Sequence, residues 1–223
     1  MGQYYRWYIT ENKNAFKDLG QGDGLKLLEA SGVRDTTVTE ILFNLKDKPR
    51  KIAFIGDYWR DYLKSEDSSS NLIEKMKKNL RGLQQLKNAS RYAPIGWRGL
   101  KQERLNTMLD YDEDLTPLYL ALGYTFEKTK IYNHDRKEKI NLPNSKLSQD
   151  NNKNRNFLMI NHPLTILCAV GNGMGMGDFD KRFGANKPEL AGLWAFESIE
   201  VSSKEDYCLD YVDKTKEYSF STH

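Results

Sequence analysis

An apolar stripe in the middle of the chain constrains the fold most strongly. Large apolar residues recur over 71–88 at steps of four, four, three and three, which is the spacing of one helix face. The stripe consists of Leu72, Met76, Leu80, Leu83 and Leu86. The other faces of the same segment are rich in lysine and arginine. We therefore expect a helix over 71–88 that packs by its stripe and presents its cations to solvent or to a charged partner.

The flanking regions of the chain have the composition of strands. Residues 1–10 and 51–55 are rich in aromatic and β-branched side chains, and Gly56 with Asp57 ends the second run. Further runs of this kind lie at 124–132, 157–160, 193–201 and 207–212. The run 164–170 fits a strand or a buried helix equally well. Strands around a helical middle predict an α+β fold, with a mixed or antiparallel sheet formed by both ends of the chain.

The length of 223 residues suits one domain that buries a sizeable core. Aromatic residues make up 12% of the chain, which excludes wholesale disorder because such side chains need a core. We expect a single domain over 1–223, with a basic and acidic helical segment at 71–123 within it. Residues 141–156 are almost entirely polar and predict a mobile loop.

The composition also bears on the compartment. No apolar run approaches the roughly 20 residues that span a bilayer, and the first residues lack the pattern of a secretory signal. The two cysteines, Cys168 and Cys208, lie far apart without a partner motif, which suits a reducing compartment. Both read as inert thiols within apolar surroundings. We therefore expect a cytoplasmic protein with no membrane partner.

Charge is strongly segregated along the chain. Residues 75–104 carry nine cations and one anion, whereas residues 105–127 carry five anions and no cation. A block of such positive charge can bind a polyanion, because each neutralised phosphate releases condensed counterions. The alternative interpretation is an ordinary solvated helix face. Six cations are candidates for phosphate contacts: Lys75, Lys77, Lys78, Arg81, Arg91 and Arg98. Tyr92 and Trp97 lie beside them and could stack on unpaired bases.

A glycine-rich segment offers a different kind of site. Glycines alternate after the apolar run 164–170, at Gly171, Gly173, Gly175 and Gly177. Such a loop lets the backbone approach a ligand closely, although the spacing matches no phosphate-binding signature. The alternative is a tight connection packed against another segment. If the loop binds a substrate, Asp178 and His162 are the candidate acid or base.

Metal binding has little support in the sequence. His134 and Glu138 have the spacing of two ligands on one helix face, but two ligands are too few for a metal site. His162 lies between two apolar runs, and a role in that turn competes with a catalytic one. The sequence therefore predicts no metal and no cofactor.

Four short segments carry a resemblance to a known family. They are Met1–Tyr5 (MGQYY), 22–27 (GDGLKL), the loop 171–178 (NGMGMGD from Asn172) and Leu193–Ala195 (LWA). In these segments the chain resembles an uncharacterised family that bacteria and their mobile elements often carry. The resemblance implies no activity, and it implies an accessory role in a phage or plasmid. Where Met174 and Met176 stand here, that family usually has an arginine and a further glycine, so an anion-binding role for the loop is weakened.

These observations support two hypotheses about function. The first is a non-enzymatic binding protein that contacts nucleic acid or a nucleic-acid-handling protein complex, such as a phage- or plasmid-borne anti-defence inhibitor. The alternative is a small cytosolic enzyme that acts on a phosphorylated or nucleotide substrate through the loop 171–178. A structural or interaction module that uses neither region is a third possibility.

Overall fold

A computed structural model of the chain describes residues 5–12, 15–19, 36–57, 59–64, 70–86, 126–141, 162–171 and 190–218. The strands are β1 (Tyr5–Asn12), β2 (Ala15–Asp18), β3 (Arg50–Gly56), β4 (Lys130–Asn133), β5 (Glu138–Asn141), β6 (Ala169–Val170), β7 (Glu197–Ser202) and β8 (Val212–Asp213). The helices are α1 (Thr36–Leu45), α2 (Trp59–Lys64), α3 (Ser70–Lys78), α4 (Leu80–Gln85) and α7 (Pro163–Leu167), and a short 3-10 helix lies at Phe126–Lys128. None of the helices in these residues is long and apolar enough to cross a membrane.

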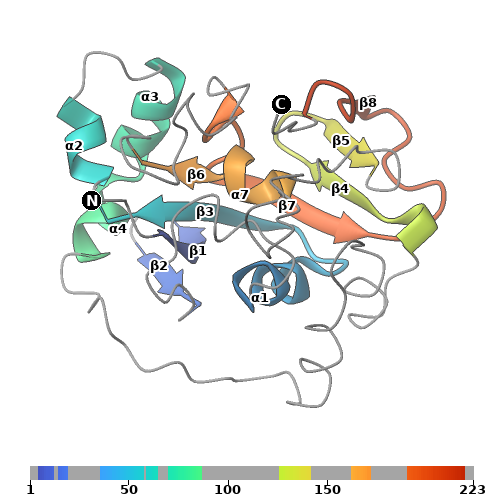
Figure 1. Cartoon of the computed structure of the whole chain (residues 1–223), viewed down its shortest axis with the longest axis horizontal. Coiled ribbons are helices and arrows are strands. Elements are labelled where there is room, and N and C mark those ends of the chain that lie inside the picture. The colour runs from blue at the N-terminus through green and yellow to red at the C-terminus, as the bar shows by residue number, and fades with distance from the viewer. Residues whose placement is uncertain are drawn as a thin grey trace, which may run out of the picture.

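The eight strands form one mixed sheet in the order β2-β1-β3-β7-β4-β5-β8, and β6 lies beside β3 (Figure 1). The pairings of β3 with β6 and of β5 with β8 are parallel, whereas the others are antiparallel. Early strands β1 and β3 thus share a sheet with late strands β6, β7 and β8. The predicted α+β class and the sheet built from both ends of the chain are confirmed.

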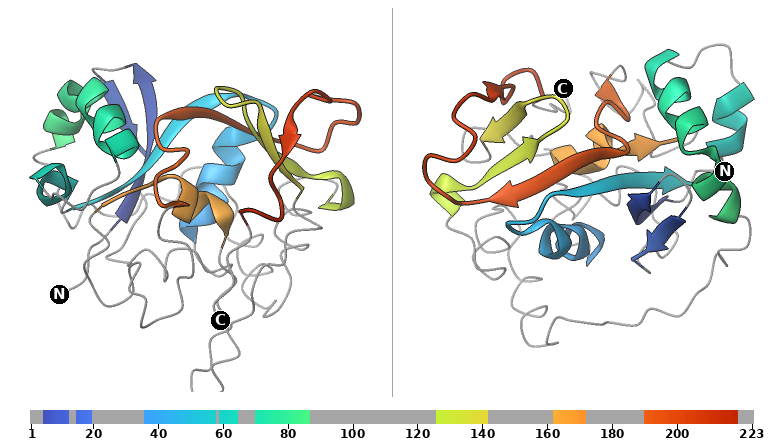
Figure 2. Two further views of the ribbon diagram at one scale, coloured as in Figure 1. Left: turned by 90° about the horizontal axis from the view of Figure 1, so that it is seen from above. Right: turned by 180° about the vertical axis from the view of Figure 1, so that it is seen from behind.

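The central strand β3 is buried on both faces, which explains its continuous apolar run. Ile52 and Phe54 face one hydrophobic cluster, and Ala53 and Ile55 face another. Helices lie on both sides of the sheet, with α1 and α7 on one side and α3 and α4 on the other (Figure 2). The alternation of strand residues therefore divides the core into two layers.

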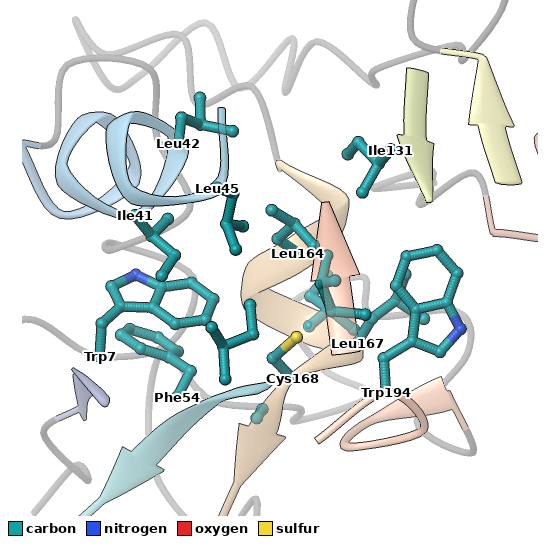
Figure 3. Packing of buried hydrophobic residues seen from close by; sticks show 14 of the residues in the cluster. Trp7, Ile41, Leu42, Leu45, Phe54, Ile131, Leu164, Leu167, Cys168 and Trp194 are labelled. Atoms are coloured by element: carbon teal, nitrogen blue, oxygen red, sulfur yellow. The ribbon is translucent and has the colours of Figure 1, made fainter. Parts of the chain in front are cut away.

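The first cluster packs α1 and α7 against the sheet. Ile41 of α1 lies beside Trp7, whose ring centroid is 4.5 Å from that of Phe54 (Figure 3). Leu42 and Leu45 of α1 belong to the same cluster. On the opposite side of the sheet, the second cluster packs a different set of helices. It joins Trp59 of α2, Leu72 and Met76 of α3 and Leu83 of α4 to strand residues of β1, β3 and β6.

The edge of β3 that faces β7 is shared by two strands. β7 pairs with Arg50–Ile52, and β6 pairs with Phe54 and Ile55. The junction requires Gly192, because its φ is +71° and a Cβ there would lie 2.6 Å from the carbonyl oxygen of Ala169. The run 164–170, which fitted either structure, is a helix followed by a strand.

Four predicted elements differ from the structure. The strand predicted for 193–201 begins only at Glu197, because residues 191–196 form turns. The helix over 71–88 is two helices, because Asn79 interrupts it. The strand predicted for 124–132 includes the short 3-10 helix and begins only at Lys130. The strand over 207–212 is wrong, since Asp206 and Cys208 have left-handed φ angles of 53° and 50° and the chain there turns. The predicted loop 141–156 begins with Asn141, which is the last residue of β5. Its other residues, the predicted strand 157–160 and residues 87–123 of the predicted helical segment lie outside the described residues.

Candidate functional site

The basic surface consists of three exposed cations, Lys77 and Lys78 on α3 and Arg81 on α4. The opposite side of these helices carries Leu72, Met76 and Leu83, which are buried against the sheet. Apolar residues at helical spacing therefore set which way the cations point. The described residues bring three of the eight candidate binding residues together in this way.

Asn79 separates the two helices. Its side-chain Nδ2 donates a hydrogen bond to the carbonyl oxygen of Lys75 at 2.9 Å, and its backbone leaves helical geometry with φ −108° and ψ 14°. Asparagine favours such local side-chain contacts over a continuous helix. α4 then starts directly after it and packs closely on β2, where Gly82 leaves room for the ring of Phe16. The basic surface is consequently short and spans two helices.

Lys75 does not belong to this surface. Its Nζ donates to the carbonyl oxygen of Leu193 at 2.6 Å and to Oε1 of Glu197 at 2.5 Å, and its side chain is only 16% exposed. Burial lowers the pKa of this lysine, while the charge of Glu197 opposes the shift. Lys75 is therefore engaged inside the protein and is not placed for a phosphate contact.

Glu197 gathers donors from three parts of the chain. Besides Lys75 on α3, Nδ2 of Asn133 lies 2.6 Å from Oε2 and Nε of Arg136 lies 2.8 Å from it. This carboxylate is 12% exposed, and each of its oxygens accepts from a donor, as a buried charge requires. The arrangement ties α3 to the start of β7 and to the turn between β4 and β5.

Lys78 remains available despite an ion pair with Glu74. The two groups are 2.6 Å apart on one helix face, and both side chains are more than 60% exposed. A pair so exposed contributes little free energy and is screened by salt. A phosphate can compete for Lys78 at a small cost.

His162 does not act as a surface acid or base. It is fully buried and caps α7, where its Nδ1 accepts a hydrogen bond from the backbone N–H of Leu164 at 3.3 Å. Burial lowers the pKa of His162 to about 3, so the ring stays neutral near pH 7. The predicted turn role is the one the structure gives it.

Of the other predicted site residues, the structure describes Gly171, which follows β6 directly. The remaining ones lie outside the described residues: Arg91, Tyr92, Trp97, Arg98, Gly173, Gly175, Gly177 and Asp178.

A polar cluster lies on the sheet beyond β3, and the sequence did not indicate it. Tyr132 of β4 pairs in register with Glu200 of β7, so both side chains share one face. His134 follows β4, and Tyr207 and Tyr211 come from the irregular segment before β8. We call these five residues the Tyr–His–Glu cluster. They come from three separate segments, and only the fold brings them together.

Hydrogen bonds run through this cluster. Nε2 of His134 lies 2.9 Å from Oε2 of Glu200, and Nδ1 of the same ring lies 2.9 Å from the Tyr211 hydroxyl. The Tyr207 hydroxyl donates to the same Glu200 oxygen at 2.8 Å. The hydroxyl of Tyr132 is buried and has no hydrogen-bond partner among the described residues.

The cluster runs from solvent to interior. The side chain of His134 is 19% exposed and that of Glu200 is 1% exposed. Burial raises the pKa of both Tyr132 and Tyr211 to about 12, and the pKa of Tyr207 also lies above its usual range because of burial. All three phenols therefore stay protonated near pH 7 and can donate hydrogen bonds, as Tyr207 does to Glu200.

His134 does not meet Glu138. Oε2 of Glu138 instead accepts hydrogen bonds from Nε1 of Trp194 at 3.0 Å and from the Tyr218 hydroxyl at 2.8 Å. Within the described parts of the chain, no group of three or more histidine, cysteine or acidic side chains is placed to hold a metal ion.

Comparison of the chain with known proteins assigns it to no family. The chain matches no family model, no curated protein and no solved structure. Any statement about function therefore rests on the geometry above.

Proposed function

We propose that this chain binds nucleic acid through the basic surface formed by Lys77, Lys78 and Arg81. The observation that carries the proposal is the orientation of these three cations, which the buried stripe of α3 and α4 turns toward solvent. The segment that continues from this surface, up to residue 104, carries five more cations and one anion.

The physical basis is counterion release. Each phosphate that a lysine or arginine neutralises frees condensed cations, and the gain does not depend on sequence. Arg81 can also bind a phosphate through two parallel hydrogen bonds, which a lysine cannot do. We therefore expect affinity without strong sequence preference.

The partly buried Lys75–Glu197 pair anchors the helix that carries two of these cations. It fixes α3 to β7, so the exposed cations of α3 are held on a defined element instead of a loose one. A binding surface benefits because less conformational freedom is lost on association.

The test is binding of labelled single- and double-stranded DNA by the full chain. In one variant Lys77, Lys78 and Arg81 are replaced by glutamate. A matched control carries the same charge change at exposed sites elsewhere, namely Lys17→Glu, Lys48→Glu and Lys216→Glu. We expect the first variant to bind about 100-fold more weakly at low salt and the control to bind much more tightly than it. Equal losses in both variants would mean that only net charge matters, and no binding by the unchanged protein would overturn the proposal.

A further inference from the structure

We propose that Tyr211, His134 and Glu200 form a nucleophilic relay that transfers a phosphodiester onto the Tyr211 hydroxyl oxygen. This inference goes beyond the binding function. It rests on a different part of the molecule, at the end of β4 and the segment before β8, and it does not require the basic surface.

Donor and acceptor accounting fixes the direction of the relay. A carboxylate oxygen can only accept, so Nε2 of His134, 2.9 Å from Oε2 of Glu200, carries the hydrogen. In the neutral ring Nδ1 is then an acceptor, and the Tyr211 hydroxyl 2.9 Å away donates to it. A hydroxyl, a base within reach and a carboxylate that orients the base are the three parts of an activated nucleophile.

Tyr207 is placed differently, although it lies only four residues away. Its hydroxyl donates directly to Glu200, so its proton faces a carboxylate, whereas the proton of Tyr211 faces the imidazole of His134. The two tyrosines therefore differ in the atom that accepts their hydroxyl hydrogen, which is Nδ1 of His134 for Tyr211 and Oε2 of Glu200 for Tyr207. This difference supplies a matched control within the same segment.

Two further groups suit a phosphate at this position. The buried hydroxyl of Tyr132 has no hydrogen-bond partner among the described residues and can therefore donate to a bound phosphate oxygen. The centroid of its ring lies 5.2 Å from that of Tyr207 and 6.1 Å from that of Tyr211. Nζ of Lys139 lies 3.4 Å and 3.5 Å from the carbonyl oxygens of Cys208 and Leu209. These hydrogen bonds are long and therefore weak, so a phosphate oxygen can replace one of the carbonyl oxygens as acceptor.

The reaction balances without a cofactor. The Tyr211 hydroxyl gives its proton to Nδ1 of His134, and its oxygen attacks phosphorus. A bond from tyrosine oxygen to phosphorus forms, and the bond from phosphorus to the leaving oxygen breaks. His134 returns the proton to that oxygen. The products are a phosphotyrosyl diester and an alcohol, and Glu200 holds the positively charged ring in place meanwhile.

The test uses bis(para-nitrophenyl) phosphate and the full chain. Attack by Tyr211 releases para-nitrophenolate in a burst of one equivalent per chain and leaves a para-nitrophenyl phosphate group on the tyrosine. We expect mass spectrometry of a digest to find this group on the peptide that holds Tyr211. The probe is a small molecule, so its result is independent of nucleic-acid binding.

Variants decide whether the relay is responsible. Tyr211→Phe should abolish the burst and the adduct, whereas in Tyr207→Phe the adduct should still form, and on Tyr211. His134→Gln should slow the burst about 100-fold or more, because the base is lost. Urea unfolding of each variant shows whether it is folded. Absence of burst and adduct in the unchanged protein, or a burst of equal size in folded Tyr211→Phe, would overturn the inference.

Discussion

Nζ of Lys75 lies 2.5 Å from Oε1 of Glu197, although 122 positions separate the two residues. Four residues of sequence contain two kinds of lysine: Lys75 is partly buried against this carboxylate, while Lys77 and Lys78 are exposed. The charge block in the sequence is therefore not one surface. Within the described residues, Lys75 pairs with Glu197, whereas Lys77, Lys78 and Arg81 are exposed.

This division predicts different effects of charge reversal on stability. Lys75→Glu would place a second carboxylate against Glu197 and leave both without a cation at that oxygen, which should cost about 3 kcal/mol or more of unfolding free energy. Lys77→Glu changes an exposed side chain and should cost at most about 0.5 kcal/mol. Urea unfolding of both variants measures the difference. Equal stabilities would contradict the buried position of Lys75.

The buried histidine predicts a pH dependence of stability. Its folded pKa of about 3 lies below the ordinary value of 6.5, so the unfolded chain binds one more proton between these values. Stability is consequently lost as pH falls through 6.5, by up to about 1.4 kcal/mol per pH unit from this group.

His162→Asn isolates that contribution. Asparagine also caps helices well and can accept the hydrogen bond from Leu164, but it does not titrate. We expect the urea midpoint of the variant to fall less steeply than that of the unchanged protein between pH 6 and pH 4. Parallel curves would show that His162 is not buried as a neutral ring.

Gly192 should tolerate no side chain. Alanine there would take a left-handed φ and bring its Cβ within 2.6 Å of both the Ala169 oxygen and Leu72. We expect Gly192→Ala to lower the unfolding free energy by about 2 kcal/mol or more. A loss below about 0.5 kcal/mol would contradict the close approach of these segments.

The two thiols should differ in reactivity. Cys168 is fully buried, and burial raises its pKa well above the ordinary value, whereas Cys208 is partly exposed. A chromogenic aromatic disulfide should label one thiol in the folded protein and the second only on unfolding. Cys208→Ser should remove the first reaction. Rapid labelling of folded Cys208→Ser would contradict the burial of Cys168.

The sequence predicted those helices and strands whose apolar residues recur at a short, regular spacing. The apolar run of β3 and the stripe of α3 and α4 are visible in the sequence because each residue follows a short period. The hairpin of β4 and β5 lacks such a signal. Its turn places Lys137 at a φ of 54°, without the glycine that usually marks such a position.

Contacts between distant segments could not be predicted in this way. The burial of Lys75 depends on Glu197, and the relay depends on Tyr211 meeting His134 across 77 positions. The residues next to a lysine or tyrosine in the sequence do not show whether its side chain meets solvent or a carboxylate from a distant segment. The candidate site was therefore predicted in part, and the Tyr–His–Glu cluster not at all.

The salt dependence of DNA binding tests the central claim most directly. The logarithm of the association constant should fall linearly with the logarithm of salt concentration for the unchanged protein. Replacing Lys77, Lys78 and Arg81 by glutamate should reduce the magnitude of that slope by about 2 to 3, one phosphate contact for each cation. An unchanged slope in this variant would contradict the proposal that these three side chains bind phosphates.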